Sequence, residues 1–490
     1  MPPVDLTRSA ALTLALALLL APVRGAADPA PGDASRALAE ALERETLAAH
    51  RVARELGVRV VDLADRREVF AAEADQPRIL ASNTKLMTTA AALTELGPDF
   101  VYETRVLIRG RVEQGVLEGD LAVLGSGDPN LSGRFHDGDA YAIFRGWARS
   151  LAARGVRRVG GDLLLVNGLF EEPRVHPDWP RDQLTTWYEA PVDALSFSDN
   201  CVLVRVRPGA RAGAPARVET VPPLDYFRIR NSARTSNDPG RLFVTREDAA
   251  DVVVVSGTVG RRSAGTDVWV AVYDPPAYFG AALRDALAGE GIEVAGGTRP
   301  VHGLPEGVWE EVTRHVSDLP TTLAVTNKRS QNFYAESLLK LLGRRLRGDG
   351  SWPGGTAAVR STMARLGLDP DRLELADGSG LSRANRASAR SMTDLLERMY
   401  FHAYGREFVR SLPHSGEEGL SWQRRLATGP YRGNVFAKTG TLRGVSTLSG
   451  YARAVSGRVY AFSILLNQVR SGADARAAQD RIVRALIDRG

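Results

Sequence analysis

Ser82-Asn83-Thr84-Lys85 places a serine and a lysine three residues apart. It follows a loop and precedes the run from Leu86 to Leu96, whose apolar pattern predicts a helix. The S-x-x-K spacing therefore puts the hydroxyl of Ser82 and the amine of Lys85 one helical turn apart, on the same face. A desolvated lysine with a lowered pKa can accept the serine proton, so the pair predicts a nucleophile that needs no histidine.

Lysine is rare in this chain, which makes the position of each one informative. The 63 basic residues include only four lysines, Lys85, Lys328, Lys340 and Lys438. Lysine can give up its proton when it is buried, whereas arginine cannot, so each lysine suggests a chemical role, with survival by chance as the alternative. A second S-x-x-K, from Ser337 to Lys340, lies inside an apolar helical run and is predicted to be structural.

A second kind of motif, Lys438-Thr439-Gly440-Thr441, occurs once and lies within the apparent strand Val435–Thr441. The amine of Lys438 and the two threonine hydroxyls can bind a substrate carboxylate. Gly440 has no side chain, so a ligand backbone can approach the strand edge closely there. The alternative, an ordinary surface strand, fits less well because arginine fills such positions elsewhere in the chain.

Two S-x-N stretches compete for a third role at the site. Ser330-Gln331-Asn332 offers a hydroxyl that can relay a proton to a leaving amine and an amide that can hold the substrate backbone. The rival is the S-D-N stretch that begins at Ser198. We favour Ser330 because it heads a predicted helix in the α/β part of the chain, whereas Ser198 lies in a β-rich insertion.

The order of the predicted elements indicates one α/β domain built from both ends of the chain. The predicted elements are a helix over Ala37–Leu56, a hairpin of Val58–Asp62 with Val69–Ala72, three strands at Val435–Lys438, Leu448–Val455 and Val459–Asn467, and a closing helix over Ala473–Arg489. Between them lie short β-prone runs and one clear helix, Ala277–Glu290. We therefore expect a catalytic domain of residues 28–100 and 310–490, with a β-rich insertion at 101–309 that is itself divided in two.

Composition and charge exclude several classes of function. A chain of 490 residues with 44% hydrophobic and 25% charged residues is typical of a globular protein with two or more domains. A net charge of +5 without a Lys/Arg run gives no reason to expect a nucleic-acid partner. Seven histidines and one cysteine show no zinc-site spacing, and no convincing G-x-S-x-G elbow occurs, so we expect neither a metal or other cofactor nor an α/β-hydrolase triad.

The N-terminus has the features of a secretory signal peptide. Arg8 precedes the apolar run from Ala10 to Val23, and the small residues at 25–27 follow where a peptidase can cut. The run is too short to span a bilayer, and no later run is long enough, so membrane association is expected to be peripheral at most. We expect residues 1–27 to be removed and the protein to be exported to the periplasm or the extracellular space, with a retained N-terminal anchor as the alternative.

The three motifs occur in the order S-x-x-K, S-x-N and K-T-G, which is the signature of penicillin-binding proteins and class A β-lactamases. The long separation of Ser82 from Ser330 resembles the class C low-molecular-mass penicillin-binding proteins, the D-Ala-D-Ala carboxypeptidase/endopeptidase family. The stretches Gly125–Pro129, Trp187–Ala190, Ala335-Glu336 and Asp377–Arg383 are similar to that family as well. Glu418–Ser421 departs from it, because the family tends to have Asp-Gly-Thr-Leu before the K-T-G strand.

This resemblance implies a transpeptidase-like, β-lactamase-like α/β fold and an acyl-transfer reaction on peptidoglycan stem peptides, with β-lactams as acylating inhibitors. Lys85 deprotonates Ser82, the backbone N–H groups of Ser82 and Thr441 hold the oxyanion, and Ser330 passes a proton to the departing amine. Two alternatives share much of this sequence: a secreted β-lactamase, and a catalytically silent peptidoglycan-binding homologue, which would be expected to carry a damaged motif.

Substrate side chains have a separate set of candidates, again implied by the resemblance. Trp179, Asp182 and Trp187 look similar to residues that line a side-chain pocket in the family, where an acid meets an ammonium group. Arg383 follows the Asp-Gly-Ser-Gly stretch and is positioned to meet a carboxylate in a bidentate pair. The alternative is that the two tryptophans are ordinary packing residues and Asp182 is a loop acid.

Overall fold

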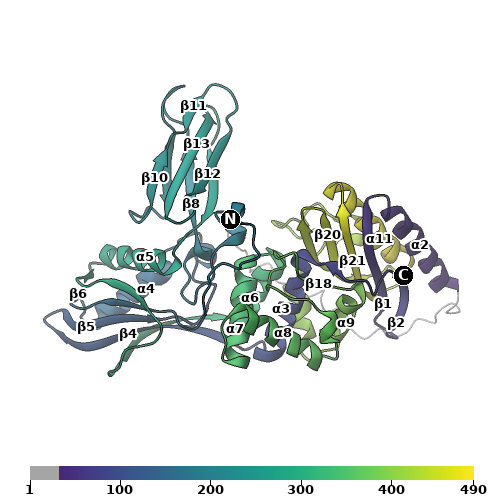
Figure 1. Ribbon diagram of the computed structural model, residues 1–490, viewed down its shortest axis with the longest axis horizontal. Coiled ribbons are helices and arrows are strands. Elements are labelled where there is room, and N and C mark those ends of the chain that lie inside the picture. The colour runs from purple at the N-terminus through teal and green to yellow at the C-terminus, as the bar shows by residue number, and fades with distance from the viewer. Residues whose placement is uncertain (1–32) are drawn as a thin grey trace. The chain divides into compact units, whose positions relative to one another are not determined.

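The computed structural model describes residues 33–490, so the predicted signal peptide at residues 1–27 lies outside the described residues. The described chain forms two compact units (Figure 1). One contains the residues up to Phe100 together with Leu319–Gly490, and we call it the Ser82 unit. The other contains Val101–Asp318, and we call it the inserted unit.

A five-stranded antiparallel sheet forms the centre of the Ser82 unit. Its order is β19-β20-β21-β1-β2, so strands from the two ends of the chain lie side by side. The strands are β1 (Ala53–Asp62), β2 (Arg67–Ala72), β19 (Val435–Leu442), β20 (Val445–Arg453) and β21 (Val459–Val469). The pairing of β1 with β21 joins the N-terminal and C-terminal parts of the chain in one sheet.

Helices cover both faces of this sheet, as the alternation of side chains along β1 requires. Val58 and Val60 belong to an apolar cluster with residues of α2 (Asp33–Ala49) and α11 (Gly472–Arg489). Arg59, which points the other way, donates from Nη1 to Thr393 Oγ1 at 2.7 Å on α9 (Ala389–Tyr400). Figure 1 shows α2 and α11 together beside the sheet.

The predicted helix over Ala37–Leu56 is wrong at its C-terminal end. The helix ends at Ala49, and Ala53 already belongs to β1. The residues from Ala53 to Leu56 pair with β21, with Ala53 opposite Val469 and Leu56 opposite Leu466. Hydrogen bonds to a strand more than 400 residues away therefore outweigh the local helix propensity of these residues. The periodicity of the sequence cannot predict such a distant pairing.

A group of packed helices places the nucleophile motif. Helix α3 (Thr84–Leu96) follows the short 3₁₀ turn η1 (Ala81–Asn83) and is buried along its first ten residues, Thr84–Leu93. It packs against α6 (Leu319–Lys328), α7 (Asn332–Arg347) and α8 (Trp352–Arg365), while η1 contacts β19 and β20. The start of α3 is therefore fixed between the sheet edge and helices α6 and α7, whose connecting turn carries Ser330.

The inserted unit enters and leaves through paired strands. β4 (Val101–Glu113) and β17 (Glu310–Asp318) run antiparallel, with Val101 opposite Asp318. Because the two ends of the insertion are neighbours, it extends the chain without separating the halves of the Ser82 unit. The predicted boundary at residue 309 falls before β17, whose pairing with β4 assigns residues 310–318 to the inserted unit.

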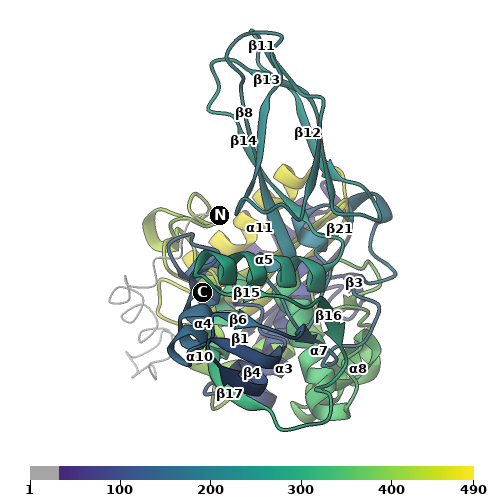
Figure 2. The same cartoon turned by 90° about the vertical axis from the view of Figure 1, so that its left-hand side faces the viewer.

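Three sheets make up the inserted unit. The largest has seven strands: β4, β5 (Val116–Leu124), β6 (Arg158–Val159), β7 (Leu163–Val166), β15 (Glu293–Val294), β16 (Thr298–Val301) and β17. The smaller sheets contain β8 (Cys201–Arg207), β9 (Arg217–Val221) and β14 (Thr266–Ala271), and β10 (Arg228–Asn231), β11 (Arg234–Ser236), β12 (Leu242–Arg246) and β13 (Val252–Gly260). Figure 2 shows these smaller sheets extending away from the seven-stranded one.

Two helices, not one, pack in the inserted unit. α5 (Pro275–Gly289) matches the helix predicted at Ala277–Glu290, whereas α4 (Ala142–Ala153) was not predicted. The buried face of α4 carries Ile143, Phe144, Trp147, Ala148 and Leu151, which is a helical spacing. Phe144 and Trp147 pack against Phe279 of α5. The missed signal was therefore a helical repeat of apolar residues within a region otherwise dominated by short strands.

Candidate active site

Ser82 and Lys85 occupy the turn where η1 becomes α3. The side chain of Ser82 is half-buried, and Lys85 is completely buried. Lys85 Nζ donates to Ser82 Oγ at 3.1 Å, as the one-turn spacing predicted. Ala81, just before the serine, has φ of +47°, a left-handed conformation that a residue other than glycine adopts only when its surroundings hold it there. The serine is therefore presented by a fixed turn.

Lys85 has two further acceptors besides the serine. Its Nζ donates to Asn332 Oδ1 at 2.6 Å and to the carbonyl oxygen of Ser379 at 2.8 Å. Complete burial lowers the pKa of Lys85 to about 7, and the negative charges of Glu336 and Asp377 limit the decrease. At neutral pH a substantial fraction of this amine is therefore uncharged, which a general base requires.

These acceptors fix the direction of the amine lone pair. A neutral lysine amine keeps two N–H bonds and one lone pair. Asn332 and the Ser379 carbonyl accept the two N–H bonds, so the lone pair points to the remaining neighbour, Ser82 Oγ. The arrangement lets Lys85 take a proton from Ser82 without rearranging. The sequence predicted a substrate-binding role for Asn332, and the structure adds its contact with the lysine.

The loop from Asp377 to Asn385 holds the Ser379 carbonyl in place. Asp377 Oδ1 accepts the N–H of Gly380 at 2.7 Å, and its Oδ2 accepts the N–H of Ser382 at 2.6 Å. Gly380 has φ of +83°, and a Cβ atom there would lie 1.8 Å from the carbonyl oxygen of Ala81. The loop therefore packs directly against the nucleophile turn, at a contact that only glycine permits.

Lys438 lies on β19 and is also buried. Its Nζ donates to Ser330 Oγ at 2.8 Å and to the carbonyl oxygen of Thr439 at 2.9 Å. Burial and the neighbouring Lys85 hold the pKa of Lys438 well below its usual range. A substrate carboxylate that binds here would favour the charged ammonium form.

Ser330 lies in the turn between α6 and α7, with φ of +55°. Like Ala81, it is therefore held in a left-handed conformation by its surroundings. Its hydroxyl touches Lys438, and Asn332, two residues later, touches Lys85. The S-x-N stretch therefore bridges the two buried amines.

Asn83 connects the nucleophile motif to the K-T-G strand through hydrogen bonds. Its Nδ2 donates to the carbonyl oxygen of Lys438 at 2.7 Å, and Ser449 Oγ donates to its Oδ1 at 2.8 Å. A Cβ atom on Gly440 would lie 2.9 Å from the backbone nitrogen of Ser82. Gly440 is therefore needed for β19 to pass beside the nucleophile, which brings Thr441 and the N–H of Ser82 to one place.

The rival motifs have different surroundings. Ser337 is buried within α7 and donates to the carbonyl oxygen of Phe333 at 2.9 Å. Lys340 Nζ lies 3.9 Å from the centre of the Trp352 ring. Ser198 belongs to η5 (Ser198–Asn200) in the inserted unit, where Asn200 Nδ2 donates to the carbonyl oxygen of Pro191 at 2.9 Å. Ser337, Lys340 and Asn200 therefore each have a local structural contact.

The two candidates for substrate side chains belong to different units. Arg383 is exposed on the Ser82 unit, and its Nη1 donates at 3.0 Å to the carbonyl oxygen of Arg443, the residue that follows β19. Asp182 is exposed on η3 (Arg181–Gln183) of the inserted unit. The structure therefore brings together the residues of the three motifs, with Arg383 near the end of the K-T-G strand.

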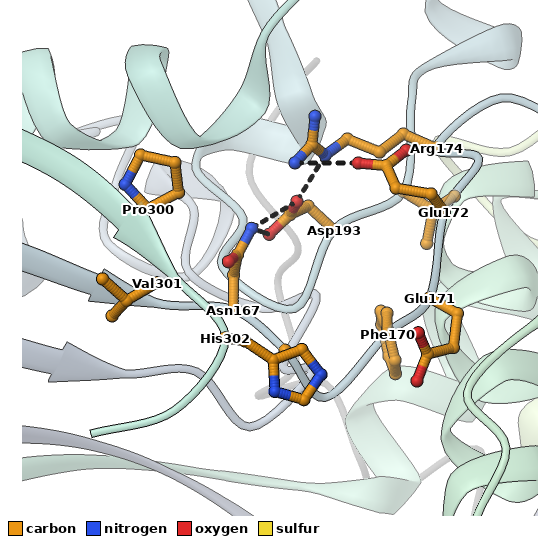
Figure 3. A pocket seen from close by; sticks show the side chains of 11 residues that line it. Asn167, Phe170, Glu171, Glu172, Arg174, Asp193, Pro300, Val301 and His302 are labelled. Atoms are coloured by element: carbon orange, nitrogen blue, oxygen red, sulfur yellow. Dashed lines mark hydrogen bonds and ion pairs between the residues drawn. The ribbon is translucent and has the colours of Figure 1, made fainter. Parts of the chain in front are cut away.

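A pocket of about 200 Å³ lies in the inserted unit, and none of the predicted site residues line it. Figure 3 shows Asp193 joined to Asn167 and Arg174, which also pairs with Glu172. Its polar groups bond to one another, so this pocket adds nothing to the acyl-transfer centre. Within residues 33–490, no cluster of three or more His, Cys, Asp or Glu side chains could hold a metal ion, and no helix is long and apolar enough to cross a membrane.

Sequence reasoning gave no role to Glu336 or to the Ser379 carbonyl. Glu336 follows Asn332 by one turn of α7, so a buried acid on the same helix face was the available signal. The contact between Lys85 and Ser379 could not be predicted from residue types, because its acceptor is a backbone oxygen.

A serine paired with a buried lysine, a second serine and a lysine-bearing strand edge, all on a sheet covered by helices, defines an active-site-serine acyltransferase of the penicillin-recognising class. A family model, the D-Ala-D-Ala carboxypeptidase 3 (S13) family, matches residues 35–488. The chain therefore belongs to this family and is a serine-type hydrolase, a class C low-molecular-mass penicillin-binding protein.

Relatives agree with this assignment. The chain is 33% identical over 448 residues to a D-alanyl-D-alanine carboxypeptidase from Actinomadura sp. (strain R39), covering 88% of this chain and 81% of that protein. It is 28% identical to the D-alanyl-D-alanine carboxypeptidase DacB of Haemophilus influenzae, over 80% of this chain and 81% of that one. The crystal structure of penicillin binding protein 4 (dacB) from H. influenzae superposes with a TM-score of 0.78 at 25% identity, covering 91% of this chain and 98% of that one.

Proposed function

We propose that this protein hydrolyses D-Ala-D-Ala bonds of peptidoglycan stem peptides through an acyl-enzyme on Ser82. The observation that carries the proposal is the position of the Lys85 amine, whose Nζ lies 3.1 Å from Ser82 Oγ and also donates to Asn332 Oδ1 and the Ser379 carbonyl oxygen. A base at the correct distance with a pKa near the working pH is the requirement for activating a serine. Family membership and the carboxypeptidase relatives support the choice of substrate.

The reaction begins when Lys85 takes the proton of Ser82. The serine Oγ attacks the carbonyl carbon of the penultimate D-alanine, and the backbone N–H groups of Ser82 and Thr441 stabilise the oxyanion. The C–N bond breaks, and Ser330 Oγ passes a proton to the departing amine, either D-alanine or a cross-linked side chain. Water then hydrolyses the ester and restores the serine.

Substrate binding is assigned to the strand edge of β19 and its neighbours. Lys438, Thr439 and Thr441 bind the terminal carboxylate, and Gly440 allows the peptide backbone to lie close to the strand. Because Asn332 Oδ1 accepts from Lys85, the Nδ2 group of Asn332 is the part that holds the substrate backbone. Arg383 and Asp182 recognise the carboxylate and the ammonium group of the stem-peptide side chain.

β-Lactams inhibit the enzyme in this proposal because their ring carbonyl acylates the same serine. A structure of H. influenzae penicillin binding protein 4 in complex with a novel β-lactam superposes on this chain with a TM-score of 0.75 at 25% identity. The signal-peptide features of residues 1–27 support export, so the substrate would be met in the cell wall, with membrane association peripheral at most.

Two assays with purified protein test this function. The first measures free D-alanine released from a peptide that ends in D-Ala-D-Ala, and the second follows a labelled penicillin by time-resolved mass spectrometry. The proposal expects D-alanine release that a penicillin blocks, together with an adduct that persists for many turnover times. Rapid penicillin turnover with no D-alanine release would identify a β-lactamase, and neither activity would identify a silent binding protein.

A further inference from the structure

Glu336 is a completely buried carboxylate that the reaction described above does not use. It lies on α7 one turn after Asn332. Its Oε1 accepts the N–H of Ser379 at 2.7 Å, and its Oε2 accepts the N–H of Gly378 at 2.9 Å and the indole N–H of Trp352 at 2.8 Å. Burying a carboxylate this completely is unfavourable unless hydrogen bonds or an opposite charge compensate for the lost hydration.

The Ser379 peptide links this carboxylate to the catalytic lysine. The N–H of Ser379 is bound by Glu336, and its carbonyl oxygen accepts Lys85 Nζ at 2.8 Å. The neighbouring N–H of Gly378 is bound as well, so Glu336 fixes both peptide N–H groups that precede the acceptor carbonyl. The same helix face carries Asn332, the other acceptor that orients the amine.

We infer that Glu336 is a positioning residue for Lys85, which orients the lysine through the Ser379 carbonyl and supplies a buried negative charge beside it. The inference rests on the proposed function, because it concerns the base of that reaction. Glu336 does not touch Ser82, and its effect reaches the serine only through Lys85. It therefore acts on how well the amine faces the serine and on the pH at which the amine becomes neutral.

The ionised form of Glu336 is the one that fits its contacts. Three N–H groups point at its two oxygens, and hydrogen bonds of this kind favour a carboxylate over a carboxylic acid. Burial and the charge of Asp377 raise the pKa of Glu336 to about 7, and these hydrogen bonds offset part of that increase. The same indole also receives a cation, because Lys340 Nζ lies 3.9 Å from the centre of the Trp352 ring.

Three titratable groups face Lys85 from the elements packed against it: Glu336 on α7, Asp377 on its loop and Lys438 on β19. The two acids raise the pKa of Lys85 against the effect of burial, whereas burial and Lys85 together hold the pKa of Lys438 well below its usual range. Removal of the Glu336 charge therefore lowers the pKa of Lys85. Because the neutral amine is the base, acylation would then persist to lower pH.

The test measures the second-order rate constant for penicillin acylation between pH 5 and 9 for the wild-type protein and for Glu336→Gln. We expect the plateau rate to fall at least about tenfold, because a glutamine amide cannot accept at both positions. The midpoint of the acidic limb should also shift to lower pH by about one unit. A purely structural role would lower the melting temperature and leave that midpoint unchanged, and this result would overturn the inference.

Two matched variants separate charge from packing. Glu336→Asp keeps the negative charge but moves the carboxylate away from the Ser379 N–H. Its plateau acylation rate should therefore fall, while the midpoint of its acidic limb should stay near that of the wild type. Trp352→Phe removes one donor to the same carboxylate without removing the charge, so it should destabilise the protein and keep the midpoint. If Glu336→Gln does not fold, an unchanged plateau in Glu336→Asp overturns the inference. Wild-type protein that fails to acylate at any pH would instead contradict the proposed function.

Discussion

The chain contains the S-x-x-K motif twice, and the two copies differ in almost every physical property. At Ser82 the motif opens a helix, the serine is half-buried, and Lys85 points back at the serine hydroxyl at 3.1 Å. At Ser337 the motif lies inside α7, the hydroxyl donates to the helix backbone at 2.9 Å, and Lys340 turns to the Trp352 ring. Identical spacing therefore brings the lysine amine to the serine hydroxyl in one copy and leaves the two side chains in separate contacts in the other.

The S-x-x-K motif alone does not supply the acceptors that orient the lysine amine. Lys85 has two acceptors from other segments, Asn332 and the Ser379 carbonyl, and these direct its lone pair to the serine. Ser337 has no such geometry available, because a serine inside a helix bonds readily to the carbonyl four residues earlier. The orientation of the amine at the first copy depends on the segments that carry Asn332 and Ser379, and the tetrapeptide alone does not determine it.

The largest expected effect is that of removing the Ser82 hydroxyl, with removal of the Ser337 hydroxyl as the matched control. Ser82→Ala should abolish penicillin labelling and lower turnover by about 10⁶, whereas Ser337→Ala should keep both near the wild-type level. D-Alanine release and gel labelling with a fluorescent penicillin measure the two effects. Labelling that survives in Ser82→Ala and disappears in Ser337→Ala would reverse the comparison.

The two lysines should respond differently to arginine. Arginine cannot give up its proton, so Lys85→Arg should lower the acylation rate by about 10²–10⁴, nearly as much as Lys85→Ala. Lys340→Arg keeps a cation that can stack on Trp352, so its acylation rate should stay within a few fold of the wild type. Lys438→Arg should retain more activity than Lys438→Ala, because the charge itself matters there. Near-normal acylation in Lys85→Arg, followed by stopped flow, would remove the general-base role.

The third prediction concerns the two S-x-N stretches. Ser330 contacts Lys438, so Ser330→Ala should slow acylation by about 10² through loss of the proton relay. Ser198→Ala, in the inserted unit, should change only the melting temperature. The reverse ranking of the two acylation rates would place the rival S-D-N stretch in the active site.

Much of this site was predictable because its residues act through side chains with defined chemistry. The S-x-x-K and K-T-G motifs predicted that Ser82, Lys85 and the strand of Lys438 belong to one site, and the structure places them in contact. The preference for Ser330 over Ser198 rested on its place before a helix, and Ser330 contacts Lys438. Glu336 was given no role, because its one-turn spacing from Asn332 does not show that it contacts the Ser379 peptide. The Ser379 carbonyl, the early start of β1 at Ala53 and the packing of α4 depend on tertiary contacts, which local sequence patterns do not contain.

The pH dependence of acylation provides a fourth test. Burial lowers the pKa of Lys85 to about 7, and only the neutral amine accepts the serine proton. Below this pH the rate should therefore fall about tenfold per unit, and above it the rate should reach a plateau. A profile of penicillin acylation from pH 5 to 9 measures this limb. A rate that does not change across this range would show that a group other than Lys85 accepts the proton.

The smallest expected effect concerns the inserted unit. Asp182→Ala should lower kcat/KM for a diaminopimelate-containing peptide at least about tenfold more than for a minimal D-Ala-D-Ala substrate, because the lost acid leaves the substrate ammonium unpaired. Arg383→Ala should show the same selectivity through the carboxylate. Equal losses on both substrates, measured side by side, would remove these residues from substrate recognition and leave the acyl-transfer centre unchanged.

Peptide mapping of the penicilloyl adduct tests the central claim most directly. Trypsin cleaves after Arg78 and Lys85, so Ser82 falls in the peptide Ile79–Lys85, whereas Ser330 and Ser337 share the peptide Ser330–Lys340. After incubation with a penicillin, the account predicts that tandem mass spectrometry finds the added mass on Ser82, in one copy per protein molecule. An adduct on the peptide Ser330–Lys340, with Ile79–Lys85 unmodified, would contradict the account.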